Sequence, residues 1–205
     1  MDCNGEVVAP VTAQDFVDAL KYVLTPDYAS SSVDLVTSYI AGADDYYNYY
    51  VYLANANGGI VDDDGTTYTV DASGVVTVAG PDGTTTYAPV DFEDVGVHAV
   101  DEHTLTYTLT YDFPGFLSLL CYLPYEPAYG PLLEETGDQF ATSAETTYSC
   151  GAFYLAAYES LETWVMKKNP ENYDAANVFI DTISRIYNAC LLYTSPSPRD
   201  LSTSR

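Results

Sequence analysis

The chain has 205 residues, with 30 Asp and Glu against 6 Lys and Arg, and a formal net charge of −24 at pH 7. So large an acidic excess argues against nucleic-acid binding, which needs Lys and Arg on the phosphates, and against anionic lipid surfaces. Apolar residues make up 47% of the chain. That is enough for a packed core, so we expect a folded protein rather than a disordered one.

The sequence carries no membrane or targeting signal. No run of about 18 apolar residues predicts a transmembrane helix, and no charged segment followed by an apolar one predicts a signal peptide. The charge suits a secreted or surface-exposed protein that it keeps soluble. A chain that lacks its natural beginning would also lack its signal.

The first third of the chain has a helical pattern. In "VTAQDFVDALKYVLTP", Thr12 is a predicted N-cap, Asp15 completes a variant of the capping box, and Pro26 ends the helix. Its apolar residues fall on one stripe: Phe16, Val17, Leu20, Val23 and Leu24. We expect further helices over residues 32–43 and 44–57, and Gly58 and Gly59 to end the last one.

Tyrosines crowd the predicted helix over residues 44–57, from Tyr46 to Tyr52. They suggest two interpretations: an aromatic platform for sugars or bases, or amphipathic side chains that cover a helix face with their hydroxyls in water. We favour the second.

The pattern changes to period two at residue 60. Residues 60–89 predict short strands separated by the turns "DASG" and "GPDG", and residues 95–111 predict a hairpin that turns at Asp101, Glu102 and His103. Two short helices are expected over residues 113–123 and 130–140. Residues 151–188 predict three strands, with a turn near Glu159. This is a mixed α and β chain with mostly hairpin connections.

Two clusters resemble metal sites only in part. Asp62, Asp63 and Asp64 precede a glycine, but an EF-hand counted from Asp62 needs Gly at its sixth position, where Thr67 stands. We therefore expect an acidic turn. His98 and His103 flank a predicted hairpin turn, and their five-residue spacing places them on opposite strand faces unless the turn brings them together. We interpret both as structural and expect no metal.

The cysteines form no recognisable framework. Cys3, Cys121 and Cys150 are widely and irregularly spaced, which fits neither a zinc motif nor a paired set. We expect Cys121, inside "FLSLLCYL", to be a small buried hydrophobic residue. A Cys3–Cys150 disulfide is an open alternative that we do not favour.

Catalytic motifs are also missing. The sequence has no G-x-S-x-G, no Cys/His constellation and no phosphate-binding glycine loop. Paired carboxylates occur throughout so acidic a chain and therefore carry no information about glycosidase chemistry. We expect no catalytic residues and no cofactor.

Three segments resemble one family. "VTAQDFVDALKYVL" looks like the helix after the entry motif in solute-binding proteins of oligopeptide ABC transporters. "VHAVDEHTLTYTLTYDFPGFLSLL" is similar to that family's hairpin and Pro/Phe-marked helix. "SCGAFYLAAYESLETWVMKKNPENYD" resembles its most diagnostic stretch. In it, Gly151 should allow close backbone approach where a strand enters a sheet, and Asn169-Pro170 should make a turn.

The resemblance implies part of a two-lobed, type II periplasmic-binding-protein-like fold, of mixed α+β class. By resemblance, residues 1–127 form a small α+β subdomain of lobe I, with a hairpin insertion at residues 58–90. Residues 128–189 form part of the central sheet of that lobe. The opening strands and the second lobe are expected to be missing.

The function implied is peptide binding, not catalysis. The expected partners are an oligopeptide ligand and the membrane permease subunits of an ABC transporter, with no nucleic acid, and the complete protein is expected to be an extracytoplasmic, lipid-anchored monomer. The family can place an aromatic ligand contact where Ser30, Ser31 and Ser32 stand, so no ligand-binding residue is carried over. Alternatives are a signalling-peptide receptor of the same fold and a secreted carbohydrate-active enzyme or glycan-binding module.

Residues 190–205, "CLLYTSPSPRDLSTSR", differ from everything before them. They are basic and rich in Ser and Pro, and "CLLYTSPSPRD" resembles the translation of a sequencing-library adapter. We expect this tail to be non-native and the natural sequence to be interrupted near Ala189.

Overall fold

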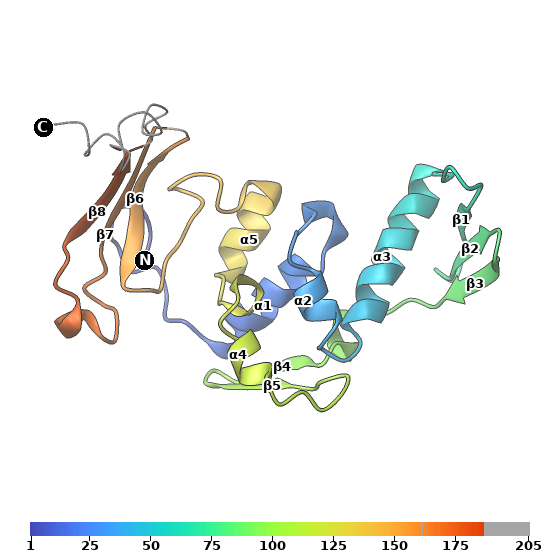
Figure 1. Cartoon of the computed structure of the whole chain (residues 1–205), viewed down its shortest axis with the longest axis horizontal. Helices are drawn as coiled ribbons and strands as arrows, with labels where there is room; N and C mark the ends of the chain where they lie inside the picture. Colours follow the sequence, from blue (N-terminus) through green and yellow to red (C-terminus); the bar gives the residue numbers. More distant parts are fainter. Residues whose placement is uncertain (161, 187–205) are drawn as a thin grey trace, which may run out of the picture. The chain divides into compact units, whose positions relative to one another are not determined.

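The computed structural model describes residues 1–160 and 162–186 (Figure 1). They form two compact units: the helical unit, Val11–Asp138, and the sheet unit, which joins Met1–Pro10 to the chain from Gln139 onward. The helical unit contains α1 (Ala13–Val23), η1 (Pro26–Tyr28), α2 (Asp34–Thr37), α3 (Ala43–Gly58), β1 (Thr67–Val70), β2 (Val76–Gly80), β3 (Gly83–Tyr87), η2 (Phe92–Asp94), β4 (Val97–Asp101), β5 (Thr104–Tyr107), α4 (Phe116–Leu119), η3 (Leu123–Tyr125) and α5 (Gly130–Thr136). None of the helices in the described part of the chain is long and apolar enough to span a membrane.

Helix α1 begins as its sequence predicts. The Asp15 carboxylate accepts hydrogen bonds from the Thr12 backbone N–H at 2.6 Å and from the Thr12 hydroxyl at 3.0 Å. These bonds satisfy a donor that the first turn leaves open, and the negative charge suits the helix N-terminus. Asp15 is only 9% exposed, so the cap also seals this end of the helix.

The core of the helical unit gathers apolar side chains from α1, α2, α3, β4 and the segment around α4. Leu20, Leu24 and Val36 are 0% exposed. The other buried members are Val17, Ile40, Ala43, Tyr46, Val95, Val97, Leu119 and Tyr125. The stripe predicted for the first helix is therefore confirmed at its central positions, and it packs against residues up to about 100 positions away in the chain.

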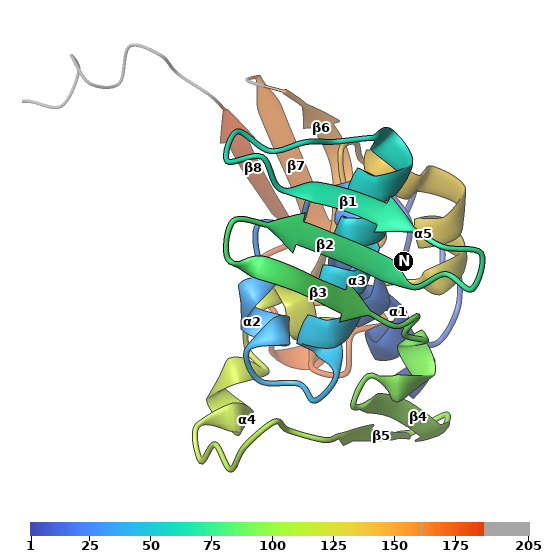
Figure 2. The ribbon, with the colours of Figure 1, turned by 90° about the vertical axis from the view of Figure 1, so that its right-hand side faces the viewer.

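Helix α3 carries a three-stranded antiparallel sheet on one side. The strand order is β1-β2-β3, and Figure 2 shows the three strands side by side with α3 behind them. Tyr49 donates its hydroxyl to the Gly74 carbonyl at 3.0 Å, and the Tyr52 ring lies 4.7 Å from Tyr87 and 5.8 Å from Tyr68. Val76 is fully buried. The strands predicted for residues 60–89 are thus present and are held to α3 by its tyrosines.

The helix predicted over residues 32–43 is wrong after Thr37. α2 ends there, and the chain turns to join the hairpin of β4 and β5. The Ala41 N–H donates to the Thr108 carbonyl at 2.9 Å, and the Gly96 N–H donates to the Ala41 carbonyl at 2.8 Å. These long-range bonds use the backbone groups that a continued helix would need for itself. Gly42 follows at φ 74°, a conformation that favours glycine.

Cys121 is exposed, so the prediction that it is buried is wrong. The apolar helix expected over residues 113–123 shrinks to the four residues of α4, with Leu119 6% exposed and facing the core. The chain leaves the helix before Cys121. Leu117 and Leu123 are 78% and 84% exposed. The apolar run predicted that these residues are buried, but a helix of one short turn can direct only part of the run toward the core.

The sheet unit contains β6 (Phe153–Glu159), β7 (Thr163–Lys168), η5 (Ala175–Asn177) and β8 (Thr182–Ile186), antiparallel in the order β6-β7-β8. A further short helix, η4 (Gly137–Gln139), lies where the two units meet in sequence. Tyr158, Trp164 and Arg185 stand opposite one another across the strands. The ring centroids of Tyr158 and Trp164 lie 5.6 Å apart, and the Arg185 guanidinium lies 5.2 Å from the Trp164 ring.

The turn after β7 depends on Asn169, which is 4% exposed. Its Nδ2 donates to the Gly151 carbonyl at 3.0 Å, and its Oδ1 accepts the Glu171 N–H at 2.9 Å. The Asn-Pro turn is present as predicted. The role given to Gly151 is wrong, because a Cβ added there would meet no atom within 4 Å.

The two units divide the chain at residues 10 and 138, whereas the sequence-based division is at residue 127. Helix α5 packs against α1 within the helical unit, which places residues 128–138 there. The assignment of both parts to one lobe stays a prediction. Cys3 carries a free thiol, so the structure contains no Cys3–Cys150 disulfide. The predicted adapter tail, residues 190–205, lies outside the described residues.

Candidate functional site

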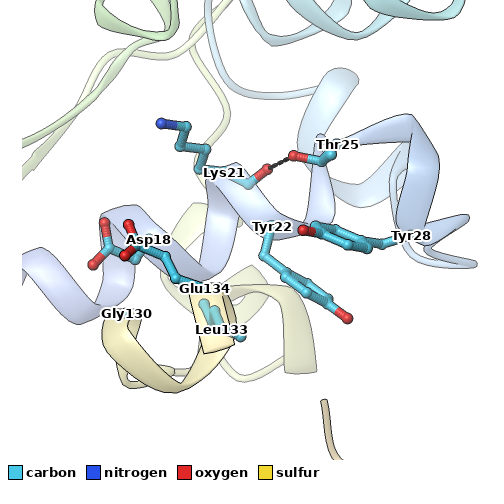
Figure 3. A pocket seen from close by; sticks show the side chains of 8 residues that line it. All are labelled: Asp18, Lys21, Tyr22, Thr25, Tyr28, Gly130, Leu133 and Glu134. Carbon is cyan, nitrogen blue, oxygen red and sulfur yellow. Dashed lines mark hydrogen bonds between the residues drawn. The ribbon is translucent and has the colours of Figure 1, made fainter. Parts of the chain in front are cut away.

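A hollow opens between α1 and α5 in the helical unit (Figure 3). Its volume is about 160 Å³, room for a small molecule or a single side chain. It is lined by Asp18, Lys21, Tyr22, Thr25, Tyr28, Gly130, Leu133 and Glu134. Three of them, Asp18, Lys21 and Tyr22, follow the spacing of one face of α1.

One wall of this hollow is a pair of stacked tyrosines. The rings of Tyr22 and Tyr28 lie 4.2 Å apart, with 12° between their planes. The Tyr22 hydroxyl donates to the Gly137 carbonyl at 2.9 Å. Burial, followed by the charge interactions with Tyr28 and Asp138, raises the pKa of Tyr22. Tyr22 therefore stays neutral at physiological pH and serves as a fixed aromatic surface rather than a proton donor.

The opposite wall carries carboxylates. Asp18 accepts a hydrogen bond from the Gln14 side-chain amide at 2.8 Å. Its other carboxylate oxygen lies against Gly130, where any Cβ would collide with it. The absence of a side chain at Gly130 thus lets α5 approach α1 at this point. Glu134 is exposed on the same side of the hollow (Figure 3).

A larger groove, of about 800 Å³, lies on the other side of Asp18 and Lys21. It is lined by Gln14, Val17, Asp18, Lys21, Asp91, Phe92, Glu93, Val97, His98 and Ala99. Lys21 Nζ lies 5.8 Å from the centroid of the Phe92 ring, within cation–π range. The described residues contain no group of three or more His, Cys, Asp and Glu placed to hold a metal ion.

Comparison with known proteins identifies the family. The model for bacterial extracellular solute-binding proteins, family 5 (middle), matches residues 4–188. The oligopeptide-binding protein AliB of Streptococcus pneumoniae is 31% identical over 186 residues, which are 90% of this chain and 22% of AliB. The oligopeptide-binding protein SarA of Streptococcus gordonii is 32% identical over 187 residues, again 90% of this chain and 22% of the relative.

The chain belongs to family 5 of the bacterial extracellular solute-binding proteins. It spans about a fifth of the length of the curated relatives it matches. An oligopeptide-binding protein of Borrelia burgdorferi shares its fold with a TM-score of 0.64 at 21% identity, over 88% of this chain and 28% of that one. The pheromone receptor PrgZ also shares the fold, with a TM-score of 0.64 at 22% identity, over 90% of this chain and 29% of PrgZ. The predicted family and the type II binding-protein fold are confirmed.

Two of the tyrosines of α3, Tyr46 and Tyr49, follow neither interpretation offered for the cluster. Tyr46 and Tyr49 are 6% and 5% exposed, so they belong to the packing of this family-5 chain. Burial, followed by the charge and hydrogen bond of Tyr50, raises the pKa of Tyr46 to about 12. Burial likewise raises the pKa of Tyr107 to about 12. Tyrosines at helical spacing can therefore pack in a core as well as form an aromatic binding surface.

Asp62 and Asp64 are used by the turn they stand in. Asp62 accepts the Tyr68 hydroxyl at 2.7 Å. Asp64 accepts the Thr66 N–H at 2.9 Å, and this bond lowers the pKa of Asp64. Asp63 is exposed beside them. This is the geometry of an acidic turn, as predicted.

The two histidines have different surroundings. His103 lies in the turn between β4 and β5, where its N–H donates to the Asp101 carboxylate at 2.8 Å. His98 lies on β4 and lines the large groove. Both histidines were predicted to be structural, and the groove beside His98 was not predicted. The spacing of Asp18, Lys21 and Tyr22, which places them on one face of a helix, was the only local signal for a site. The groove also needs residues of β4, and only the folded structure brings β4 next to this helix.

Proposed function

We propose that the complete protein is the extracytoplasmic substrate-binding component of a peptide ABC transporter. The single observation that supports this is the match of residues 4–188 to the family, with relatives named oligopeptide-binding proteins at 31% and 32% identity. On this proposal the present chain supplies part of one lobe, and an extended peptide is held between this lobe and a second one.

The mechanism is binding without catalysis. An extended peptide forms main-chain hydrogen bonds with the walls of the cleft, as in strand addition, and its side chains enter tolerant, hydrated pockets. Lobe closure then presents the complex to the membrane permease. The complete protein is a lipid-anchored monomer outside the cytoplasm and needs no metal, cofactor or nucleic acid. Residues 58–90 are an insertion that the cleft does not require.

A receptor for signalling peptides is the second candidate. The likeness to PrgZ supports it only at the level of fold, since one fold hosts both functions. A permease gene beside the complete reading frame, together with peptide uptake that stops when the gene is deleted, favours transport. Peptide-dependent gene expression without uptake favours the receptor.

The test compares the completed protein with this chain by calorimetry, using short peptides free of Lys and Arg. Binding by the complete protein at about 1 μM corresponds to about 8 kcal/mol. Removing one wall of the cleft forfeits about half of the contacts, so we expect the present chain to bind near millimolar. Micromolar binding of these peptides by the chain alone would overturn the two-lobe proposal, and no binding by the completed protein would overturn peptide binding itself.

A further inference from the structure

The large groove runs along an edge of strand β4. Val97, His98 and Ala99 are consecutive in the strand and all line it. Successive side chains of a strand point to opposite faces of the sheet. Because three consecutive residues of β4 line the groove, we infer that the groove lies beside the strand and not over one of its faces. Within the described residues, β4 pairs with β5 alone. The groove therefore borders the other edge of β4.

The hydrogen-bond pattern tells which backbone groups face this edge. The Thr108 N–H donates to the Gly96 carbonyl at 2.7 Å, and the Thr106 hydroxyl donates to the His98 carbonyl at 3.3 Å. The carbonyls of Gly96 and His98 thus point toward β5, while the Gly96 N–H is donated to the Ala41 carbonyl. Backbone groups alternate in direction along a strand, so Ala99 directs its N–H and carbonyl toward the groove. An added strand would find both a donor and an acceptor there.

The groove combines an apolar floor with a charged rim. Val17 and Val97 are 8% and 1% exposed, and the Phe92 ring is half-buried. Asp91 and Glu93 are exposed on either side of Phe92, and Asp18 on α1 also lines the groove. The two exposed carboxylates therefore border a floor that suits the aliphatic stems of long side chains.

Charge selects the kind of partner. Residues 11–138 contain 21 Asp and Glu residues and a single Lys, which is Lys21, a formal charge of −20. That lysine lies in the groove itself, over the Phe92 ring. A surface with this potential attracts cationic ligands and repels anionic ones.

We propose that the groove between α1 and β4 binds an extended peptide segment that carries Lys or Arg side chains. The segment adds to the edge of β4 through the backbone of Ala99, and its basic side chains pair with Asp91 and Glu93. This site lies wholly within the helical unit and does not depend on a second lobe. It is thus independent of the proposed transport function.

The first experiment uses the 205-residue chain and two fluorescein-labelled hexapeptides, one alternating Thr and Lys and one alternating Thr and Gln. We expect the Lys peptide to bind at least about tenfold more tightly at low salt, and the difference to shrink near 1 M salt, where the Debye length falls to about 3 Å. N-methylation of alternate amides should abolish binding in one of the two possible patterns, because strand addition uses every second residue. Equal binding of the two peptides, or no binding of either, overturns the proposal.

The second experiment changes the rim in both directions. Asp91→Asn and Glu93→Gln should each weaken the Lys peptide about two- to fivefold, the range for exposed ion pairs, whereas Lys21→Gln should strengthen it. Asp82→Asn, an exposed change of equal charge in the turn between β2 and β3, is the matched control and should change the affinity by less than twofold. A structural role alone cannot produce effects of opposite sign at one groove. If Lys21→Gln weakens binding while thermal unfolding is unchanged, the proposed charge selection is wrong.

Discussion

The helical unit and the sheet unit differ in how far each buries its own apolar residues. The helical unit closes a core in which Leu20, Leu24 and Val36 have no exposed surface. In the described part of the sheet unit, the only buried residues are Ala144 and Asn169. Several of its large apolar side chains are exposed instead, Tyr173 at 100% and Phe179 at 88%.

Charge separates the two units in the same way. Residues 11–138 have a formal charge of −20, whereas the described residues of the sheet unit hold eight acidic and three basic residues, a charge of −5. The basic ones, Lys167, Lys168 and Arg185, all lie on β7 and β8. The charge keeps the helical unit soluble, whereas the exposed apolar side chains of the sheet unit mark a surface that another partner or segment covers.

The largest expected effect comes from separating the units. Residues 11–138 alone should unfold cooperatively in urea, because their core lies entirely within that range. Residues 139–186, mixed with a peptide of residues 1–10 that belongs to the same unit, should show no cooperative transition, because a small sheet with so few buried residues is marginal in water. Circular dichroism of the two pieces measures this. A cooperative transition in the sheet piece would show that its core is complete and that the two units do not differ in this respect.

A single core truncation should have the next largest effect. Leu20→Ala should lower the free energy of unfolding of the helical unit by about 2–5 kcal/mol, since the side chain is fully enclosed. The control is Leu117→Ala, a leucine that is 78% exposed on α4, which should cost less than about 0.5 kcal/mol. Equal losses for the two variants in urea titrations would contradict the core described here.

In the sheet unit, the residue whose substitution should destabilise the structure most is a buried polar one, Asn169. Asn169→Ala removes the donor to Gly151 and the acceptor for Glu171, and leaves the Gly151 carbonyl and the Glu171 N–H without these partners. We expect a loss of about 1–3 kcal/mol. Asn172→Ala, a half-buried asparagine three residues later that donates to the Cys150 carbonyl, should cost about 1 kcal/mol or less. Hydrogen exchange of the β6 and β7 amides in the whole chain measures both, and an Asn172 effect as large as that of Asn169 would contradict this role.

The sequence predicted element type well where the pattern was local. The capping box of Thr12 and Asp15, the glycine end of α3 and the hairpins of β1–β3 and β6–β8 are all present. The sequence-based prediction was wrong where backbone hydrogen bonds to distant parts of the chain determine the local structure. Ala41 leaves the helical pattern because Thr108 and Gly96 bind its backbone, and Cys121 is exposed because α4 stops before it.

The candidate site was not predictable in the same way. Asp18 and Lys21 share a helix face that the spacing indicates, but the groove also requires His98 and Ala99, nearly 80 residues away. Their side of β4 is defined by pairing with β5, which no local pattern in the sequence specifies. The family resemblance supplied the fold and left the site open, since no ligand residue could be carried over at Ser30, Ser31 or Ser32.

The smallest expected effect is a pH dependence confined to the helical unit. Burial raises the pKa of Tyr46 to about 12 from its usual value of 10.0, so the folded state holds this proton more tightly than the unfolded chain. The resulting stability is fully present below about pH 10 and is lost as pH rises through about 12. Thermal unfolding of residues 11–138 between pH 9 and pH 12 should therefore show a falling midpoint above about pH 10. Tyr46→Phe keeps the ring against Phe92 but has no proton to lose, so its midpoint should fall less steeply than that of the unchanged unit. Tyr173→Phe in the whole chain, at a fully exposed position, should leave the slope unaltered. A Tyr46→Phe variant with the original slope would mean that Tyr46 does not ionise differently in the folded and unfolded states.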